Sequence, residues 1–232
     1  MTSINAGGAF YRVQNAINEN SERVSASMQR LSSGLQNVAA GDRVASSAVA
    51  FGQKAQLNTL KIGIQNATEV VQALEMAASS ISKMSELIVR LEELNALGEN
   101  GFNNADDKAA IDAEGSAIKT EITDLQANAL YKGKDIFGGA VSVGTGKDNT
   151  ALTVNAGSKH TPVLSADVLG KGTGATEIST LKQAIDALQV TAGAKYTRAM
   201  NTMSQLTSLR AGYAIDVASK LDVDFAGETT EL

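Results

Sequence analysis

The sequence predicts a mainly α-helical protein, an elongated antiparallel bundle or coiled coil of long helices with a small β-hairpin insert. Residues 44–97 contain no proline and only two glycines, and their apolar residues recur at spacings of three and four. Aromatic residues make up 4% of the chain and tryptophan is absent, which favours closely packed helices over a thick globular core. The single proline, Pro162, lies in a glycine-rich region. We therefore expect long helices to dominate the fold.

The first amphipathic segment lies near the N-terminus. Phe10, Val13, Ile17 and Val24 fall on one helical face, with Asn20 as a polar break, and the pattern ends at Gly34. A short helix owes its stability to packing, so we expect this one to be partly disordered until something covers it. We assign residues 1–43 to this helix and a linker, and residues 44–232 to a helical domain.

The central segment is the longest. Its apolar residues form a stripe along one face, and after Ile81 this stripe steps by three residues, a phase change that overwinds a coiled coil without ending it. From Asp42, a candidate N-cap, to a stop at Gly98, the helix would be about 80 Å long at about 1.5 Å per residue. No globule of this size covers such a helix, so other segments or other copies must. The stripe consists of Leu57, Leu60, Ile64, Ala67, Val71, Leu74, Ala78 and Ile81, and then Met84, Leu87, Leu91 and Leu94.

A polar turn over residues 98–110 precedes a third stripe, over residues 111–125. The short connection predicts an antiparallel return along the central helix. We interpret Asp106 and Asp107 as a cap, because acidic residues in a first turn complement the helix dipole.

Residues 138–177 are rich in glycine, valine and threonine, with short alternations around Val141 and Leu152. This composition predicts a small β-hairpin insert with little to pack.

The last helix is expected from Ile178 to about Leu221, with its bulkiest groups, Tyr196, Met203 and Leu206, locking it against the central helix. Leu206→Ala should therefore lower the melting temperature markedly, and Val154→Ala in the insert should change it little.

Composition and residue types exclude several function classes. The net charge is −5 and the basic residues are scattered, so neither nucleic acid nor an anionic membrane surface is an expected partner. The chain contains no cysteine, no apolar window long enough for a bilayer, and no secretory signal pattern at its start, which alone would favour the cytoplasm. These features leave soluble interaction proteins and enzymes to be weighed.

No catalytic, cofactor-binding or metal-binding residue emerges. His160 is the single histidine and lies in a loop without a ligand set. The carboxylates of Glu92 and Glu93 point in directions about 100° apart on a helix and do not share a site. Gly144–Lys147 lacks the full phosphate-loop pattern. We therefore predict that the protein is not an enzyme and has no cofactor.

The segment MQRLSSGL at residues 28–35, followed by a polar linker and a long helix, resembles the N-terminal signature of bacterial flagellin. The resemblance continues at residues 65–67, 88–94 and 131–134, and again at residues 222–229 near the end. After the motif, residues 38–45 depart from the family pattern.

The resemblance implies a structural subunit that self-assembles into the flagellar filament, with export chaperone, cap and junction proteins as further partners. It implies export through the flagellum's own channel without a cleaved signal peptide, and hence an extracellular location. It also implies a further C-terminal helix, so we expect residues 1–232 alone to be a monomeric fragment. The expected subunit-interface residues are Phe10, Val13, Ile17, Val24, Arg30, Leu31, Ser32, Ser33, Gly34 and Leu35.

The resemblance also implies a surface that an innate immune receptor reads, formed by Val89, Arg90, Glu93 and Glu114. Glu92 stands where the family commonly has a second arginine, a charge reversal within this surface.

Two alternatives remain. One is a hook–filament junction protein of the same family. The other, from a different class, is a signalling helical hairpin like a chemoreceptor cytoplasmic domain, which would need two arms of equal length meeting at a tip.

Overall fold

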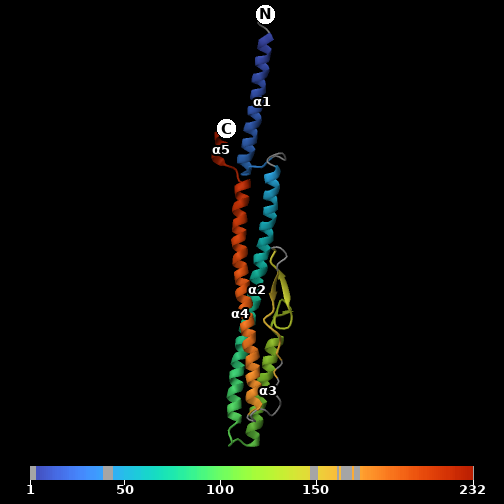
Figure 1. Cartoon of the computed structure of the whole chain (residues 1–232), viewed down its shortest axis with the longest axis vertical. Helices are drawn as coiled ribbons and strands as arrows, with labels where there is room; N and C mark the ends of the chain where they lie inside the picture. The colour runs from blue at the N-terminus through green and yellow to red at the C-terminus, as the bar shows by residue number, and fades with distance from the viewer. Residues whose placement is uncertain are drawn as a thin grey trace. The chain divides into compact units, whose positions relative to one another are not determined.

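The computed structural model describes residues 4–38, 44–146, 151–160, 162, 169 and 173–231. Long helices dominate it, as the sequence predicts, and the β structure is confined to short hairpins (Figure 1). The helices are α1 (Ile4–Ser33), α2 (Val44–Gly98), α3 (Ala105–Ala127), α4 (Thr173–Leu221) and α5 (Phe225–Glu231). The strands are β1 (Leu130–Tyr131), β2 (Lys134–Asp135), β3 (Val141–Gly144) and β4 (Ala151–Val154).

The chain divides into two compact units. Unit 1 comprises Met1–Thr59 and Ser208–Leu232, and unit 2 comprises Leu60–Thr207. The helices α2 and α4 each contribute to both units. The boundary that the sequence predicts after residue 43, and the candidate N-cap Asp42, lie outside the described residues, so they stay predictions.

In unit 2, α4 runs antiparallel to α2. Polar contacts between the two helices show this direction, because residue numbers fall along α2 as they rise along α4. The pairs are Glu92 with Lys182, Glu75 with Tyr196, and Thr68 with Met203.

The core of unit 2 lies along one wide face of α2. Leu60, Leu74, Ile81, Met84 and Leu91 from the predicted stripe are at most 3% exposed. The face is wider than predicted, because Val70, Ala73, Ala77 and Ile88 are also buried, whereas Ala78 is exposed. The additional burial follows from packing on more than one side of the helix by α3, α4 and the hairpins.

The helix α3 begins with a capping box. Asn104 is the N-cap, and its side-chain oxygen accepts a hydrogen bond from Asp107 N over 2.8 Å. The Asp107 carboxylate in turn accepts from Asn104 N over 3.0 Å. Asp106 and Asp107 lie in the first turn, as predicted, and Asp107 closes the capping box, but the N-cap residue itself is Asn104.

The glycine-rich insert packs more than expected. Before the insert, β1 and β2 pair as a short hairpin with strands of two residues each; within the insert, β3 and β4 pair antiparallel with Val141 opposite Val154. Leu152, Val154 and Ala156 belong to the hydrophobic core of unit 2 and are at most 6% exposed. The expectation that the insert has little to pack is wrong, because alternate strand residues face the helices rather than solvent.

The β3 hairpin approaches α2 closely at one glycine. A Cβ on Gly63 would lie 1.8 Å from the carbonyl oxygen of Thr145. Next to this contact, Asn66 Nδ2 donates a hydrogen bond to the Gly144 carbonyl over 2.8 Å. Glycine at position 63 therefore lets the hairpin lie directly on the helix backbone.

Candidate interaction surfaces

The α1 helix in unit 1 presents an apolar face to solvent. Phe10, Val13 and Ile17 are 65%, 58% and 63% exposed, and Phe10 also makes an edge contact with Tyr11, itself 67% exposed. Val24, further along the same stripe, is half-buried. The helix begins at Ile4, earlier than the first stripe residue. These predicted interface residues thus share one uncovered face.

Unit 1 has little core of its own. Among the described residues, its buried hydrophobic side chains are confined to Ala50, Leu221 and Val223, whereas the rest of the buried hydrophobic set belongs to unit 2. Large exposed hydrophobic residues are correspondingly frequent in unit 1. They include Met28, Val44, Val49, Phe51, Ile215 and Phe225, each more than half exposed. The apolar surface of this unit is therefore available to a partner.

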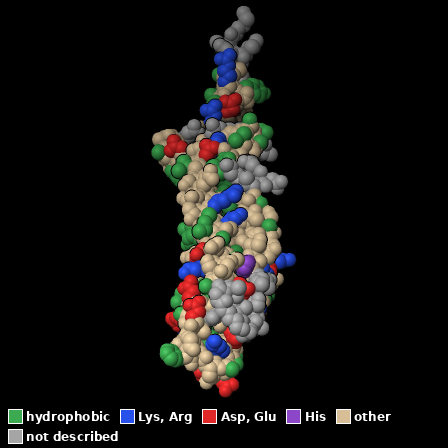
Figure 2. All heavy atoms as spheres, turned by 60° about the horizontal axis from the view of Figure 1, so that its bottom comes forward, with side chains coloured by type: hydrophobic (Ala, Val, Ile, Leu, Met, Phe, Trp, Pro, Cys, Tyr) green, Lys and Arg blue, Asp and Glu red, His purple; other side chains and the backbone are tan. Residues whose placement is uncertain are grey.

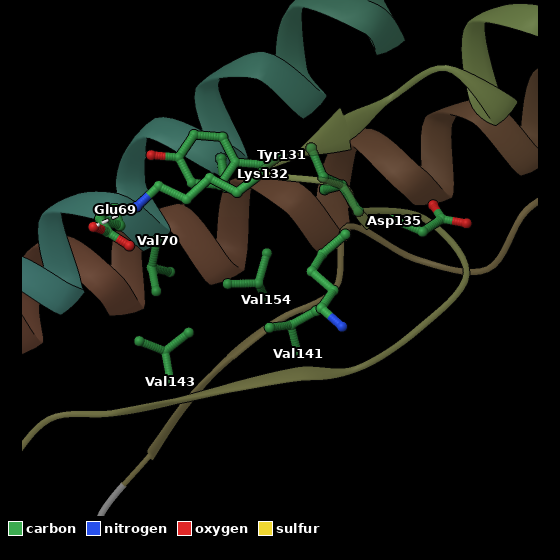
Figure 3. Close-up of a pocket in the computed structure, with 11 residues that line it drawn as sticks. Glu69, Val70, Tyr131, Lys132, Asp135, Val141, Val143 and Val154 are labelled. Carbon is green, nitrogen blue, oxygen red and sulfur yellow. Dashed lines mark hydrogen bonds and ion pairs between the residues drawn. The ribbon is translucent and has the colours of Figure 1, made fainter.

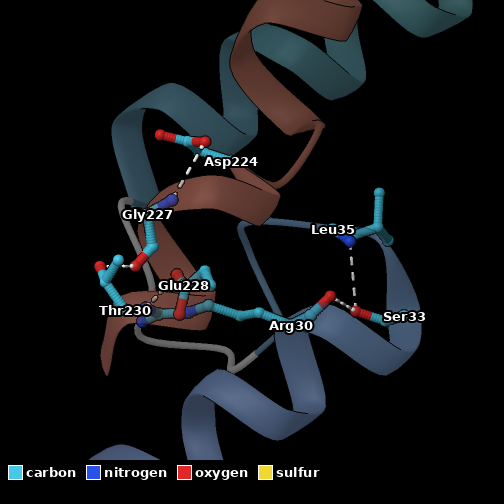
Figure 4. A network of polar contacts seen from close by, with 7 residues as sticks. All are labelled: Arg30, Ser33, Leu35, Asp224, Gly227, Glu228 and Thr230. Atoms are coloured by element: carbon cyan, nitrogen blue, oxygen red, sulfur yellow. Dashed lines mark hydrogen bonds and ion pairs between the residues drawn. The ribbon is translucent and has the colours of Figure 1, made fainter. Parts of the chain in front are cut away.

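The end of α1 is closed by a glycine turn. Gly34 has φ +69°, and its N–H donates to the Arg30 carbonyl over 2.8 Å, as expected for a left-handed C-terminal cap. Ser33 Oγ donates to the same carbonyl over 3.2 Å and accepts from Leu35 N over 3.3 Å (Figure 4). Leu31 is half-buried, and Ser32 is exposed.

This turn is joined to the C-terminal segment of unit 1. Leu35 and Asp222 form an isolated antiparallel β-bridge, and Gln36 N donates to the Leu221 carbonyl over 2.7 Å. Asp224 Oδ1 then accepts from Gly227 N over 3.2 Å at the start of α5 (Figure 4). The chain after Gly34 is therefore held by backbone contacts to residues almost two hundred positions away.

An ion pair completes this junction. Arg30 Nη1 lies 3.1 Å from Glu228 Oε1, with side chains 29% and 12% exposed (Figure 4). Hydrogen bonds from Ser27 and then Arg30 hold the pKa of Glu228 below its usual value. Arg30 was predicted as an interface residue, whereas Glu228 was not. No local pattern connects the two, because helical spacing carries no information about partners so far apart.

The four residues of the predicted receptor surface lie together in unit 2. Arg90 Nε donates to Glu114 Oε1 over 2.8 Å, and Arg90 Nη1 donates to Glu93 Oε2 over 2.9 Å. These carboxylates, Glu93 first, raise the pKa of Arg90. Val89 beside them is 51% exposed. The arrangement fixes the guanidinium between α2 and α3 while leaving the cluster open to solvent.

Glu92, the residue at which the charge is reversed, also forms an ion pair. Glu92 Oε1 lies 2.9 Å from Lys182 Nζ on α4, and both side chains are about half exposed. Hydrogen bonding to Glu92 raises the pKa of Lys182. The carboxylate at this position is thus neutralised by α4 rather than by α3.

The described residues offer no competing chemical site. They contain no group of three or more histidine, cysteine or acidic side chains that could hold a metal ion. None of the helices in the described ranges is long and apolar enough to cross a membrane. On the face drawn in Figure 2, acidic and basic side chains are interspersed. His160 takes part through its backbone, which exchanges hydrogen bonds of 2.7 and 3.0 Å with the buried Gln126 side chain.

Comparison with known proteins decides the family. Residues 4–142, more than half of the chain, match the family described as the bacterial flagellin N-terminal helical region. The chain belongs to the bacterial flagellin family. The resemblance that begins at residues 28–35 is therefore confirmed.

Individual flagellins support this assignment. The chain is 28% identical over 131 residues to a flagellar filament 33 kDa core protein of Treponema phagedenis, covering 56% of this chain and 46% of that protein. It is 29% identical over 181 residues to a secreted flagellin C of Campylobacter jejuni, covering 76% of this chain and 61% of the relative. The chain thus spans about half the length of these flagellins.

A solved structure shows the same fold. The crystal structure of Bacillus cereus flagellin superposes with a TM-score of 0.56 at 19% identity, covering 61% of this chain and 88% of that one. At this identity the likeness concerns the fold alone.

Proposed function

We propose that this chain is a structural subunit that self-assembles into the bacterial flagellar filament and acts outside the cell. The observation that carries the proposal is the uncovered apolar face of α1, formed by Phe10, Val13 and Ile17, in a unit with few buried side chains. Burying a large apolar side chain contributes about 1.5–3 kcal/mol, so covering this face by other copies would drive assembly.

The junction at the end of α1 supports the same proposal. The exit of α1 from the rest of unit 1 is fixed by the hydrogen bonds of Ser33 and Gly34 to the Arg30 carbonyl and by the ion pair of Arg30 with Glu228. A fixed exit presents the apolar face in a defined direction, which a regular polymer requires because every copy must make the same contacts. Ser32, which is exposed, is available to a neighbouring subunit.

Further partners follow from the same role. Before assembly, the exposed face of α1 would be covered by an export chaperone, and after export the first and last subunits would contact junction and cap proteins. We infer that the protein leaves the cell through the flagellum's own channel.

Polymerisation tests this function. The complete gene product should form long filaments after salting-out, seen by electron microscopy and recovered by sedimentation. Ile17→Asp should abolish pelleting, whereas Asn15→Asp on the same helix should not. If the complete product stays monomeric under all salting-out conditions, the filament function is wrong. If it assembles only onto preformed filament or hook ends, it is a junction protein.

We also propose that the cluster of Val89, Arg90, Glu93 and Glu114 is a surface that an innate immune receptor can contact. The ion pairs hold Arg90 in one orientation, and a preordered, exposed guanidinium loses little freedom on binding. Where the family commonly has a second arginine, this chain has Glu92. The opposite charge lowers the complementarity of this cluster to the receptor, so we expect the receptor to bind the chain weakly.

Receptor binding can be measured with Arg90→Ala and with Glu92→Arg. We expect the first change to reduce binding of the monomer to the receptor ectodomain and the second to increase it. Equal binding by both variants would contradict this surface. The filament proposal would stand, because polymerisation is measured separately.

A further inference from the structure

One aromatic side chain in unit 2 lies almost entirely in solvent. Phe102 is 98% exposed, in the connection between α2 and α3. The loop around it is ordered by its own hydrogen bonds: Phe102 N donates to Asn100 Oδ1 over 3.1 Å, and Asn103 Nδ2 donates to the Leu97 carbonyl over 2.7 Å. The loop therefore presents the ring on a fixed base.

A hollow of matching size lies elsewhere in the same unit. It has a volume of about 120 Å³ and opens between α2 and the two hairpins (Figure 3). Its floor is apolar, with valine side chains from α2, β3 and β4 converging on it (Figure 3). A protein cavity of about 150 Å³ accepts benzene, so a phenyl ring fits a hollow of this size and chemistry. The apolar lining residues are Val70, Ala73, Ile136, Val141, Val143 and Val154.

The charges around ring and hollow are complementary. Residues 98–108 carry Glu99, Asp106 and Asp107 against Lys108, which gives this segment a net charge of −2. At the rim of the hollow, Lys132 is paired with Glu69 over 2.7 Å.

The rim keeps a further positive charge. Asp135 is paired with Lys159, whereas Lys134 has no ion pair among the described residues. The acidic loop is therefore attracted to Lys134 at the rim.

We propose that Phe102 of one copy inserts into this hollow on a second copy of the chain. This inference rests on the filament function proposed above and specifies one of its contacts. Insertion within one chain is excluded, because Ala73 and Gly98 are separated along one helix by about 40 Å at about 1.5 Å per residue. Ring and hollow are different surfaces, so each copy offers one to the next, and the contact repeats along an open chain of subunits.

The absence of cysteine from residues 1–232 makes a cross-linking test selective. Gly101→Cys, which keeps the Phe102 ring and meets no atom within 4 Å, and Lys134→Cys are made in the complete gene product, copolymerised, treated with a short bis-maleimide, and run on a denaturing gel. We expect cross-linked dimers between the two variants. The matched control replaces Lys134→Cys with Val190→Cys, a site that is 73% exposed on α4 and away from the hollow, and should give no dimer.

Charge reversal supplies a second measurement. Lys134→Glu should raise the protein concentration needed for polymerisation several-fold, and adding Asp106→Lys to the same chain should restore it. Both positions are exposed, so circular dichroism should show unchanged folding of each variant.

The outcomes separate the contact from the function. Filaments that form with no more cross-linking than the Val190→Cys control would overturn the contact and leave the filament function intact. Cross-links from position 134 that mass spectrometry maps to a segment other than the Phe102 loop would also overturn it. If the unsubstituted product forms no filaments at all, the function itself is wrong, and the contact falls with it.

Discussion

Replacing Gly63 by alanine should destabilise unit 2, although the same change usually stabilises a helix. The new Cβ would lie 1.8 Å from the Thr145 carbonyl oxygen and 2.6 Å from its carbonyl carbon, where ordinary contacts begin near 3.4 Å. These are backbone atoms, so no side-chain rotation relieves the clash. The end of β3 must instead move away from α2, which strains the 2.8 Å bond between Asn66 and Gly144.

The expected magnitude follows from three opposing effects. Overpacking costs about 1–3 kcal/mol, and weakening the Asn66 hydrogen bond adds up to about 1 kcal/mol. Alanine recovers about 1 kcal/mol of helix propensity relative to glycine. The free energy of unfolding should therefore fall by up to about 3 kcal/mol, which at about 2–4 °C per kcal/mol lowers the melting temperature by up to about 12 °C for a chain of this size.

Gly193→Ala is the matched control. Gly193 also lies inside a helix of unit 2, but an added methyl group there would meet no atom within 4 Å beyond the backbone of its own helix and its chain neighbours. This change should raise stability by up to about 1 kcal/mol. Urea unfolding followed by circular dichroism measures both. If Gly63→Ala is as stable as Gly193→Ala, the hairpin does not lie on α2 as described.

Other perturbations give distinct expectations. Val154→Ala removes two buried carbons at about 0.8 kcal/mol each, so by urea unfolding it should cost about 2 kcal/mol, and an unchanged midpoint would place the insert outside the core. Leu206→Ala should cost about 2–5 kcal/mol in the same assay, and a smaller loss than Val154→Ala would contradict its burial. The carboxylate of Glu228 has a lowered pKa, so its contribution to holding Arg30 is present above pH 4.5 and is lost as acid protonates it. Amide exchange in α5 should accelerate on acidification relative to Glu228→Gln, and identical pH profiles would refute the coupling. Asn104→Ala should lower the free energy of unfolding by about 1 kcal/mol in the urea assay, and an unchanged midpoint would contradict its role as the N-cap of α3.

Helix positions could be predicted from the sequence because their signal is local. The spacing of Leu60, Ile81 and Leu91 reports the buried face of α2 directly, and all three are at most 3% exposed. The glycine after α1 likewise marks its end, because Gly34 adopts the positive φ that such caps require.

Features that depend on distant neighbours could not be predicted in this way. Val154 alternates with polar residues in a glycine-rich segment, and only the helices that it packs against make it part of the core. Asn104 competes with Asp106 as a cap, and the choice depends on where the first turn begins. Nothing near Arg30 in the sequence indicates that Glu228 is its partner.

The scarcity of buried side chains in unit 1 has a consequence for how its stability is measured. When the native state of a segment is completed by binding other copies, its apparent stability follows mass action and rises with protein concentration. Each tenfold increase in free subunit adds about 1.4 kcal/mol per contact that binds only the folded form. The α1 helix should therefore have no single melting temperature, whereas unit 2, which buries its own core, should stay folded even at subunit concentrations too low for assembly.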